Sequence, residues 1–190
     1  MNTPAHVVLN LLCLGRRDLA SVLTPVIVGA VLPDAPMFIF YGYERIIRGM
    51  SESWIWREGY YQVHWQNFID LFNSIPLMLL GLGIAIWGRS QFGILLFTSM
   101  LLHIAGDLPL HHDDGHRHFF PFSDWRFVSP ISYWDPKHYG NIVSIVEILS
   151  VAMTSAILFQ NYHSAAGKFI IGIIGALYSL YFFYVVTVWM

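Results

Sequence analysis

Two long apolar runs, residues 141–160 and 167–190, constrain this chain more than any other feature. A bilayer core needs about 20 predominantly apolar residues in one helix, and both runs reach that length. Shorter apolar segments lie at 5–14, 19–43, 74–88 and 92–108. Only 12% of the residues are charged, whereas soluble domains carry about 25%. We therefore predict an all-α fold, an integral membrane helical bundle of five to six helices.

The rest of the composition narrows the class of protein further. No Gly/Ser-rich linker and no internal repeat divides the chain, so we predict a single membrane-embedded domain, residues 1–190. The lone Cys13 has no second cysteine to pair with, which excludes a disulfide framework and a cysteine-based zinc site. A net charge of −2, with no basic cluster beyond Arg16-Arg17, argues against a nucleic-acid partner. Residues 1–6 lack the charged start of a secretory signal, so we expect the first helix to be retained.

Histidine and aspartate gather where the 92–108 run ends. His103 and Asp107 have i,i+4 spacing, which places both side chains on one face of a helix. A histidine-rich segment, residues 111–118, follows directly. Imidazole and carboxylate groups are ligands of zinc and its first-row neighbours, and they are costly to bury beside lipid unless they are paired or ligating. The pattern indicates a metal site; the alternative is a structural His–carboxylate pair that holds the helix end.

The expected topology brings further ligands to the same place. A hairpin of the first two apolar segments, turning at Gly15-Arg16-Arg17-Asp18, returns His6 and Asp34 to one side. Helix alternation then puts residues 44–73 and 109–140 on that side as well. We therefore expect the His/Asp site near one membrane face. His6 could instead lie at the interface without binding anything.

Asp34 lies in Pro33-Asp34-Ala35-Pro36, a sequence that should end or kink the helix of the 19–43 segment. The freed backbone groups must then be satisfied by protein or by a wet cavity, so Asp34 should face protein. Capping of the following helix is the alternative role for this residue.

Three other sets of polar residues allow more than one interpretation. A stripe on one side of a predicted helix either lines a cavity or faces water; its members are His64, Asn67, Asp70 and Ser74. The 111–118 segment either contributes ligands or is a solvated loop. Glu147 lies within an apolar helix, where an acid needs a partner, and we expect it to be a ligand, a supporting group or a catalytic carboxylate. His138 and His163 are expected on the surface.

The order of five short motifs resembles the LexA-binding, inner-membrane-associated family of bacterial metal-dependent hydrolases. The motifs are Thr3-Pro4-Ala5-His6, Gly29-Ala30-Val31-Leu32-Pro33-Asp34, His64, His103-Ile-Ala-Gly-Asp107 and Phe120-Pro121-Phe122-Ser123. The resemblance covers roughly residues 1–125. That family is itself similar to bacterial zinc-dependent phospholipase C, an all-α enzyme.

The resemblance implies a set of metal ligands. They are His6, Asp34, His64, His103 and Asp107, with a further ligand from His111, His112 or His116. It also implies a divalent metal, zinc first and manganese as the alternative. The phospholipase pattern ends in His-x-x-x-Glu, but residue 143, four before Glu147, is valine. We therefore expect one or two metal ions rather than three.

Metal chemistry then suggests an activity. A bound zinc ion lowers the pKa of its water toward about 7, which favours hydrolysis at neutral pH. Asp34 and Glu147 are predicted as catalytic carboxylates, and Arg117 or Arg126 as a substrate-binding group that holds a phosphoryl oxygen through its planar donors. The chain has no His-Glu-x-x-His motif, so a phosphoester is preferred to a peptide. The membrane setting makes a lipid or a lipid-linked small molecule the expected substrate, and the bacterial inner membrane the expected location of a multi-pass protein.

Two other classes of function remain open. One is a His-rich membrane metallo-oxidase, although the His-x-x-His-His boxes typical of that class do not occur here. The other is a transport or regulatory protein in which the His and Asp sites are structural or carry protons or ions.

Overall fold

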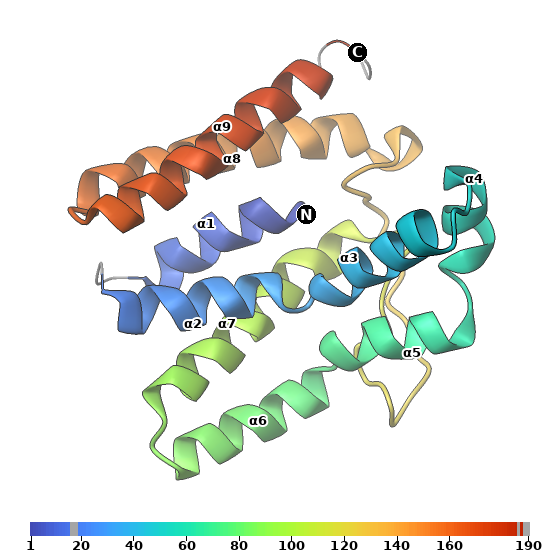
Figure 1. The fold of residues 1–190 in the computed structure, drawn as a ribbon, viewed down its shortest axis with the longest axis horizontal. Coiled ribbons are helices and arrows are strands. Elements are labelled where there is room, and N and C mark those ends of the chain that lie inside the picture. The colour runs from blue at the N-terminus through green and yellow to red at the C-terminus, as the bar shows by residue number, and fades with distance from the viewer. Residues whose placement is uncertain (16–18, 186, 188–190) are drawn as a thin grey trace.

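The computed structural model describes residues 1–15, 19–185 and 187. This part of the chain is 74% helical and contains no strand, which confirms the all-α prediction. The α-helices are α1 (Thr3–Leu14), α2 (Ala20–Val31), α3 (Ala35–Gly42), α4 (Glu52–Trp54), α5 (Val63–Phe72), α6 (Ile75–Trp87), α7 (Gln91–Asp107), α8 (Gly140–Asn161) and α9 (Ala165–Tyr184) (Figure 1). Short π-helices, Tyr43–Ile47 and Ile55–Gly59, flank α4, and 3-10 turns lie at Leu108–Leu110 and Pro136–His138.

Four helical segments of the described chain are long and apolar enough to cross a membrane. They are Val63–Trp87, which joins α5 and α6, Gln91–Leu110, Gly140–Asn161 and Ala165–Tyr184. A fifth is reached if the bent pair Ala20–Val31 and Ala35–Ile47 counts as one span. The structure therefore supports four to five spanning helices, where the sequence predicted a bundle of five to six, because α1 is apolar but short.

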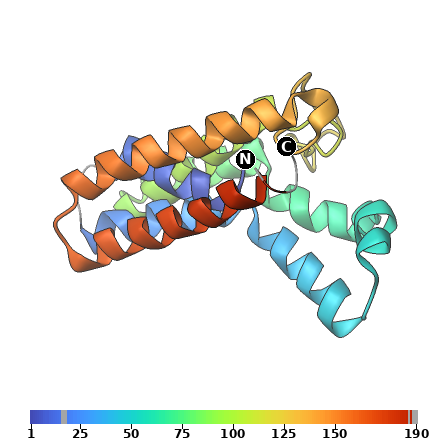
Figure 2. The ribbon, with the colours of Figure 1, turned by 90° about the horizontal axis from the view of Figure 1, so that it is seen from above.

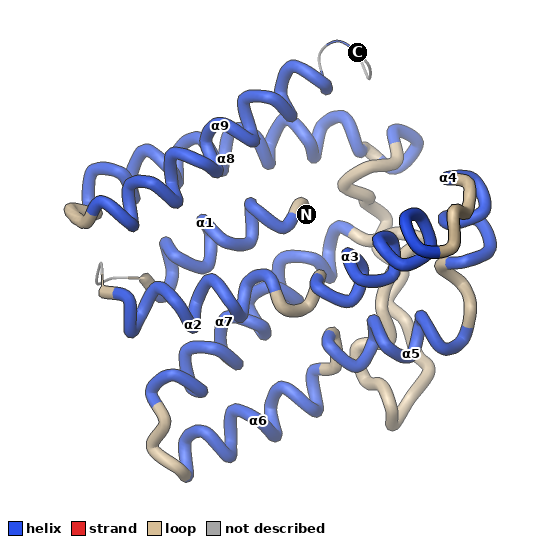
Figure 3. The backbone as a smooth tube through the Cα atoms, in the orientation of Figure 1, coloured by secondary structure: helices blue, strands red, loops and turns tan. Residues whose placement is uncertain are grey.

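The helices pack in layers (Figure 1). In Figure 1, α8 and α9 pair along the top, α1 lies beneath them, α2 and α7 follow, and α6 is outermost. The main core forms between α1, α2, α8 and α9, and includes Val8, Leu11, Val26 and Val151. The α6–α7 and α8–α9 turns lie at one end of the bundle, while the N-terminus and the long loop that follows α7 lie at the other (Figure 3).

A bend of 54° separates α2 from α3, where the sequence places two prolines. Pro33 and Pro36 cannot donate a backbone hydrogen bond, so the helix is interrupted between Val31 and Ala35 as predicted. Asn73 Nδ2 donates to the freed carbonyl of Pro33 over 3.1 Å. The predicted hairpin also forms, although Arg16, Arg17 and Asp18 of its turn lie outside the described residues.

Beyond the bend, the chain from α3 to the start of α5 projects from the bundle as an arm (Figure 2). This arm has its own core, which is made of Phe40, Ile55, Tyr60 and Ile69. Its surface exposes apolar side chains such as Ile46 and Ile47 beside charged ones such as Arg45, Arg57 and Glu58. Such mixing of aromatic, charged and exposed apolar residues is typical of a membrane interface.

Small residues let α2 approach α7 closely. A Cβ on Gly29 would lie 2.4 Å from the Leu96 carbonyl oxygen of α7. Ser99 Oγ donates across the same contact to the Val26 carbonyl over 2.6 Å. Small side chains and interhelical hydrogen bonds are the usual means of close packing between membrane helices. This contact fixes the C-terminal half of α2 against the middle of α7.

Candidate metal centre

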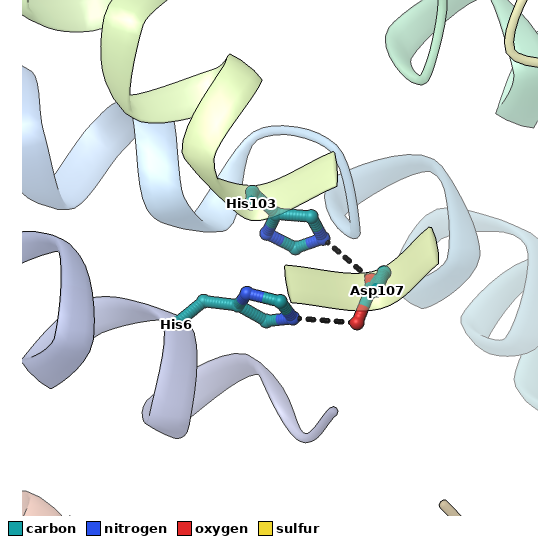
Figure 4. Close-up of side chains that lie close together, drawn as sticks. All are labelled: His6, His103 and Asp107. Atoms are coloured by element: carbon teal, nitrogen blue, oxygen red, sulfur yellow. Dashed lines mark hydrogen bonds and ion pairs between the residues drawn. The ribbon is translucent and has the colours of Figure 1, made fainter. Parts of the chain in front are cut away.

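Two helices distant in sequence bring three potential ligands together. His6 comes from α1, and His103 and Asp107 come from α7 (Figure 4). One ligand atom from each residue lies within 4.8 Å of the others, and all three side chains are buried. His6 Nε2 donates to Asp107 Oδ1 over 2.9 Å, and His103 Nε2 lies 3.0 Å from Asp107 Oδ2. The two imidazole rings stack with their centroids 3.6 Å apart. We call these three residues the His6 cluster.

The orientation of His103 suits a metal ligand. Its Nδ1 donates to the Ala30 carbonyl of α2 over 2.8 Å, and a carbonyl can only accept. The other ring nitrogen, Nε2, points at the carboxylates of Asp107 and Asp34 and has no hydrogen-bond partner among the described residues. A neutral imidazole with Nδ1 held this way presents a lone pair at Nε2. That arrangement requires a cation between nitrogen and carboxylates, either a proton or a metal ion.

Asp34 lies beside the His6 cluster. It stands at the N-cap position of α3, but its side chain makes no capping hydrogen bond. Asp34 Oδ2 instead accepts from Thr3 Oγ1 over 2.5 Å, and its Oδ1 lies 3.5 Å from His103 Nε2. The structure therefore favours the site interpretation of Asp34 over the capping one.

The loop after α7 places further histidine and aspartate side chains beside the His6 cluster. His111 Nε2 lies 3.6 Å from Asp107 Oδ1, and its Nδ1 lies 3.0 Å from Asp114 Oδ2. Burial lowers the pKa of His111, but the two carboxylates outweigh it and raise that pKa to about 9. Burial raises the pKa of Asp114, and contact with His111 more than reverses this, so the Asp114 pKa falls below its usual value. The ring of His116 lies next to that of His111, with centroids 5.7 Å apart.

A cavity of about 610 Å³ opens onto these groups. Its charged lining residues are Asp34, Asp107, Asp113 and Asp114, accompanied by His111 and His116. Its aromatic walls are Phe38, Trp56, Tyr60, Tyr61, Tyr133 and Trp134. No lysine or arginine is among the lining residues of the described chain. The cavity is therefore acidic at its floor and aromatic at its walls, and two cationic groups face that floor: the amino group of Met1, 2.5 Å from Asp107 Oδ1, and the imidazole of His111.

Three predicted site residues lie apart from the His6 cluster. His64 is exposed on α5, where its ring packs against Trp65. His112 Nδ1 donates to the Ser129 carbonyl, and its ring stacks on His138 at 3.6 Å. Glu147 accepts hydrogen bonds from Asn2 and Tyr178.

The two predicted substrate-binding arginines hold the loop in place. Arg117 Nε donates to the buried Asp70 over 2.5 Å, and its other nitrogens donate to Asn67 and Asp124. Arg126 donates to the Gly115 carbonyl and to Gln66. Within the polar stripe of α5, Asn67 and Asp70 thus bind the loop, whereas His64 is exposed; none of these three residues lines the cavity.

The sequence prediction omitted several residues that shape the site. Thr3 and Asp114 contact the candidate ligands directly, and Tyr133 and Trp134 line the cavity. Asp114 could have been found from its i,i+3 spacing to His111. The others carry no distinct signal, since Tyr and Trp near a membrane end are expected as interface anchors.

The fold and the site together define a class: a helical protein with several helices able to cross a membrane and a buried His/Asp cluster that could hold a metal ion. Comparison with protein-family models, curated proteins and solved structures finds no match to this chain.

Proposed function

We propose that this protein is a multi-pass enzyme of the bacterial inner membrane that hydrolyses a phosphoester of a lipid or lipid-linked substrate with the help of a divalent metal ion. The observation that carries the proposal is the His6 cluster, in which three buried ligand residues meet, with Asp107 and the adjacent Asp34 lining the cavity. The held Nδ1 of His103 supports it further, since ligating histidines usually donate their second nitrogen to a carbonyl or carboxylate.

The residues present fit a zinc or manganese ion. His6, His103 and Asp107 would hold the metal, with Asp34 and His111 as the neighbouring groups able to bind a second ion. A bound metal would supply hydroxide from water near neutral pH and polarise a phosphoryl oxygen. Asp34 lines the cavity beside His103, so it is placed to accept a proton from a water molecule there.

The cavity suits a lipid headgroup. Its four carboxylates are only partly balanced by the Met1 amino group and by His111, so a metal ion would help an anionic phosphoester to bind. Its walls include Phe38 and Trp56 of the projecting arm, which are exposed apolar side chains at the place where a membrane interface is expected. A substrate with one end in the bilayer and a phosphate in the cavity would match both features.

The first experiment measures metal content in the detergent-purified protein after loosely bound ions are removed. We expect near-stoichiometric zinc or manganese in the wild type and its loss in both His103→Ala and Asp107→Ala. His64→Ala is the matched control: the resemblance makes His64 a ligand, but its side chain is exposed away from the cluster, so this variant should keep its metal.

Phosphate or phosphoester products released from mixed phospholipid micelles would then test the activity. The metal-loaded wild type and His64→Ala should release product, and Asp107→Ala should not. A wild type that holds no zinc or manganese even after reloading would contradict the proposal, as would full activity in Asp107→Ala.

A further inference from the structure

The residue that precedes α1 attaches this helix to α8. Asn2 occupies the N-cap position of α1, where asparagine usually caps its own helix, yet its side chain makes no such bond. Asn2 Nδ2 instead donates to Glu147 Oε1 over 2.7 Å, and the Asn2 backbone amide donates to the same oxygen over 3.2 Å. The start of α1 is therefore held by a carboxylate of another helix, α8.

Glu147 is in turn held by α9. The Tyr178 hydroxyl donates to Glu147 Oε1 over 2.6 Å, so three donors meet on one oxygen. Glu147 is only 5% exposed and lies within an apolar helix, where an acid is costly unless it is partnered. Its place beside the N-terminus of α1 is also favourable, because a helix N-terminus attracts negative charge.

The next residues of the same helical turn reach the proposed metal centre. Thr3 donates to Asp34, and His6 donates to Asp107. One turn of α1 thus connects an acid of α8 with the two acids of the site. A shift of this turn would move a ligand, and metal sites tolerate displacements of only about 0.5 Å.

We infer that Glu147 and Tyr178 form a positioning pair, which holds the first turn of α1 so that His6 and Thr3 meet Asp107 and Asp34. The inference rests on the proposed function, since it assigns the pair a purpose in that site. It replaces the catalytic role expected for Glu147, because the carboxylate acts through Asn2 rather than on substrate or metal.

The test compares four variants of the full-length protein in detergent. Glu147→Leu removes the acceptor, Glu147→Gln keeps an acceptor oxygen without the charge, and Tyr178→Phe removes one donor. Ser155→Ala is the matched control, because Ser155 lies on the same helix and its hydroxyl has no hydrogen-bond partner among the described residues. Two quantities are measured: zinc affinity by competition with a chelator, and hydrogen exchange of the amides of residues 5–9 without metal.

We expect Glu147→Leu to lower zinc affinity roughly tenfold or more, as loss of a group that orients a ligand typically does. The same variant should speed exchange in the first turns of α1. Tyr178→Phe should show a smaller loss in both measurements. Glu147→Gln should match the wild type in zinc affinity and in amide exchange. That result would show that Glu147→Leu loses zinc because it lacks an acceptor, not because it lacks a charge.

Two results would overturn the inference. One is zinc affinity and exchange in Glu147→Leu equal to those of Ser155→Ala. The other is loss of zinc in both Glu147→Gln and Glu147→Leu with unchanged exchange, which would place the carboxylate at the metal itself. A wild type without zinc, combined with faster exchange in Glu147→Leu, would reject the proposed function while supporting the attachment of α1 through Glu147.

Discussion

At the scale of single residues, two aspartates have separate places: one belongs to the candidate metal cluster, and the other binds the loop that follows α7. Asp107 faces two histidines at the cavity floor. Asp70, which is fully buried on α5, accepts from Arg117 and lies 3.5 Å from His116. Because His116 lines the cavity, Asp70 supports the site from behind.

At the residue scale, we expect Asp70→Ala to lower the free energy of unfolding by about 3 kcal/mol, because the largely buried Arg117 would lose its buried carboxylate partner and keep only the exposed Asp124. Thermal unfolding in detergent measures this loss. The control is Asp124→Ala, which removes an exposed partner of the same arginine and should cause no measurable change. Equal stability of the two variants would contradict the assigned role of Asp70.

Between helices, a close approach of α2 and α7 lies beside the site. The carbonyl of Ala30 on α2 accepts from His103 on α7, and the neighbouring Gly29 is where the two helices meet most tightly. The contact thus sets both the spacing of the helices and the orientation of a ligand.

At the element scale, we expect Gly29→Ala to destabilise the protein by about 2 kcal/mol, since overpacking of a close contact forces the backbone to shift. It should also weaken zinc binding, because α2 carries the acceptor for His103. Gly172→Ala on α9 is the control: a Cβ there meets nothing within 4 Å, so stability and zinc affinity should be unchanged. Unfolding curves measure the stability of both variants, and chelator competition measures their zinc affinity. A Gly29→Ala protein with wild-type zinc affinity would argue against a link between the α2–α7 contact and the metal site.

Across the whole molecule, the site lies at one end of the bundle. The loop that follows α7 is at that end, while the α6–α7 and α8–α9 turns are at the other (Figure 1). If the helices cross a bilayer, these two ends face opposite sides of the membrane.

At the whole-molecule scale, single cysteines introduced into a Cys13→Ser background test this arrangement. Asp113→Cys should react with a membrane-impermeant maleimide from one side of the membrane only. Gln91→Cys and His163→Cys should react from the opposite side. All three positions are exposed in the structure. Labelling of Asp113→Cys and Gln91→Cys from the same side would mean that α7 does not cross the membrane.

Hydropathy and spacing alone were sufficient for part of this description. The apolar runs predicted an all-α fold, Pro33 and Pro36 predicted the break after α2, and the i,i+4 pair His103/Asp107 predicted two neighbouring ligands. These features are local: chain length against bilayer thickness, the missing donor of proline and the pitch of a helix decide them without reference to distant residues.

Long-range packing decided the rest. Only the tertiary structure brought His6 to Asp107 and left His64 and His112 elsewhere, although the family resemblance made all four residues candidate ligands. Likewise, only packing attached Glu147 to Asn2 and the two arginines to polar side chains of α5. The physical reason is that a side chain's chemistry follows from its type, but its partners follow from how helices approach one another, and that depends on contacts between residues far apart in the chain.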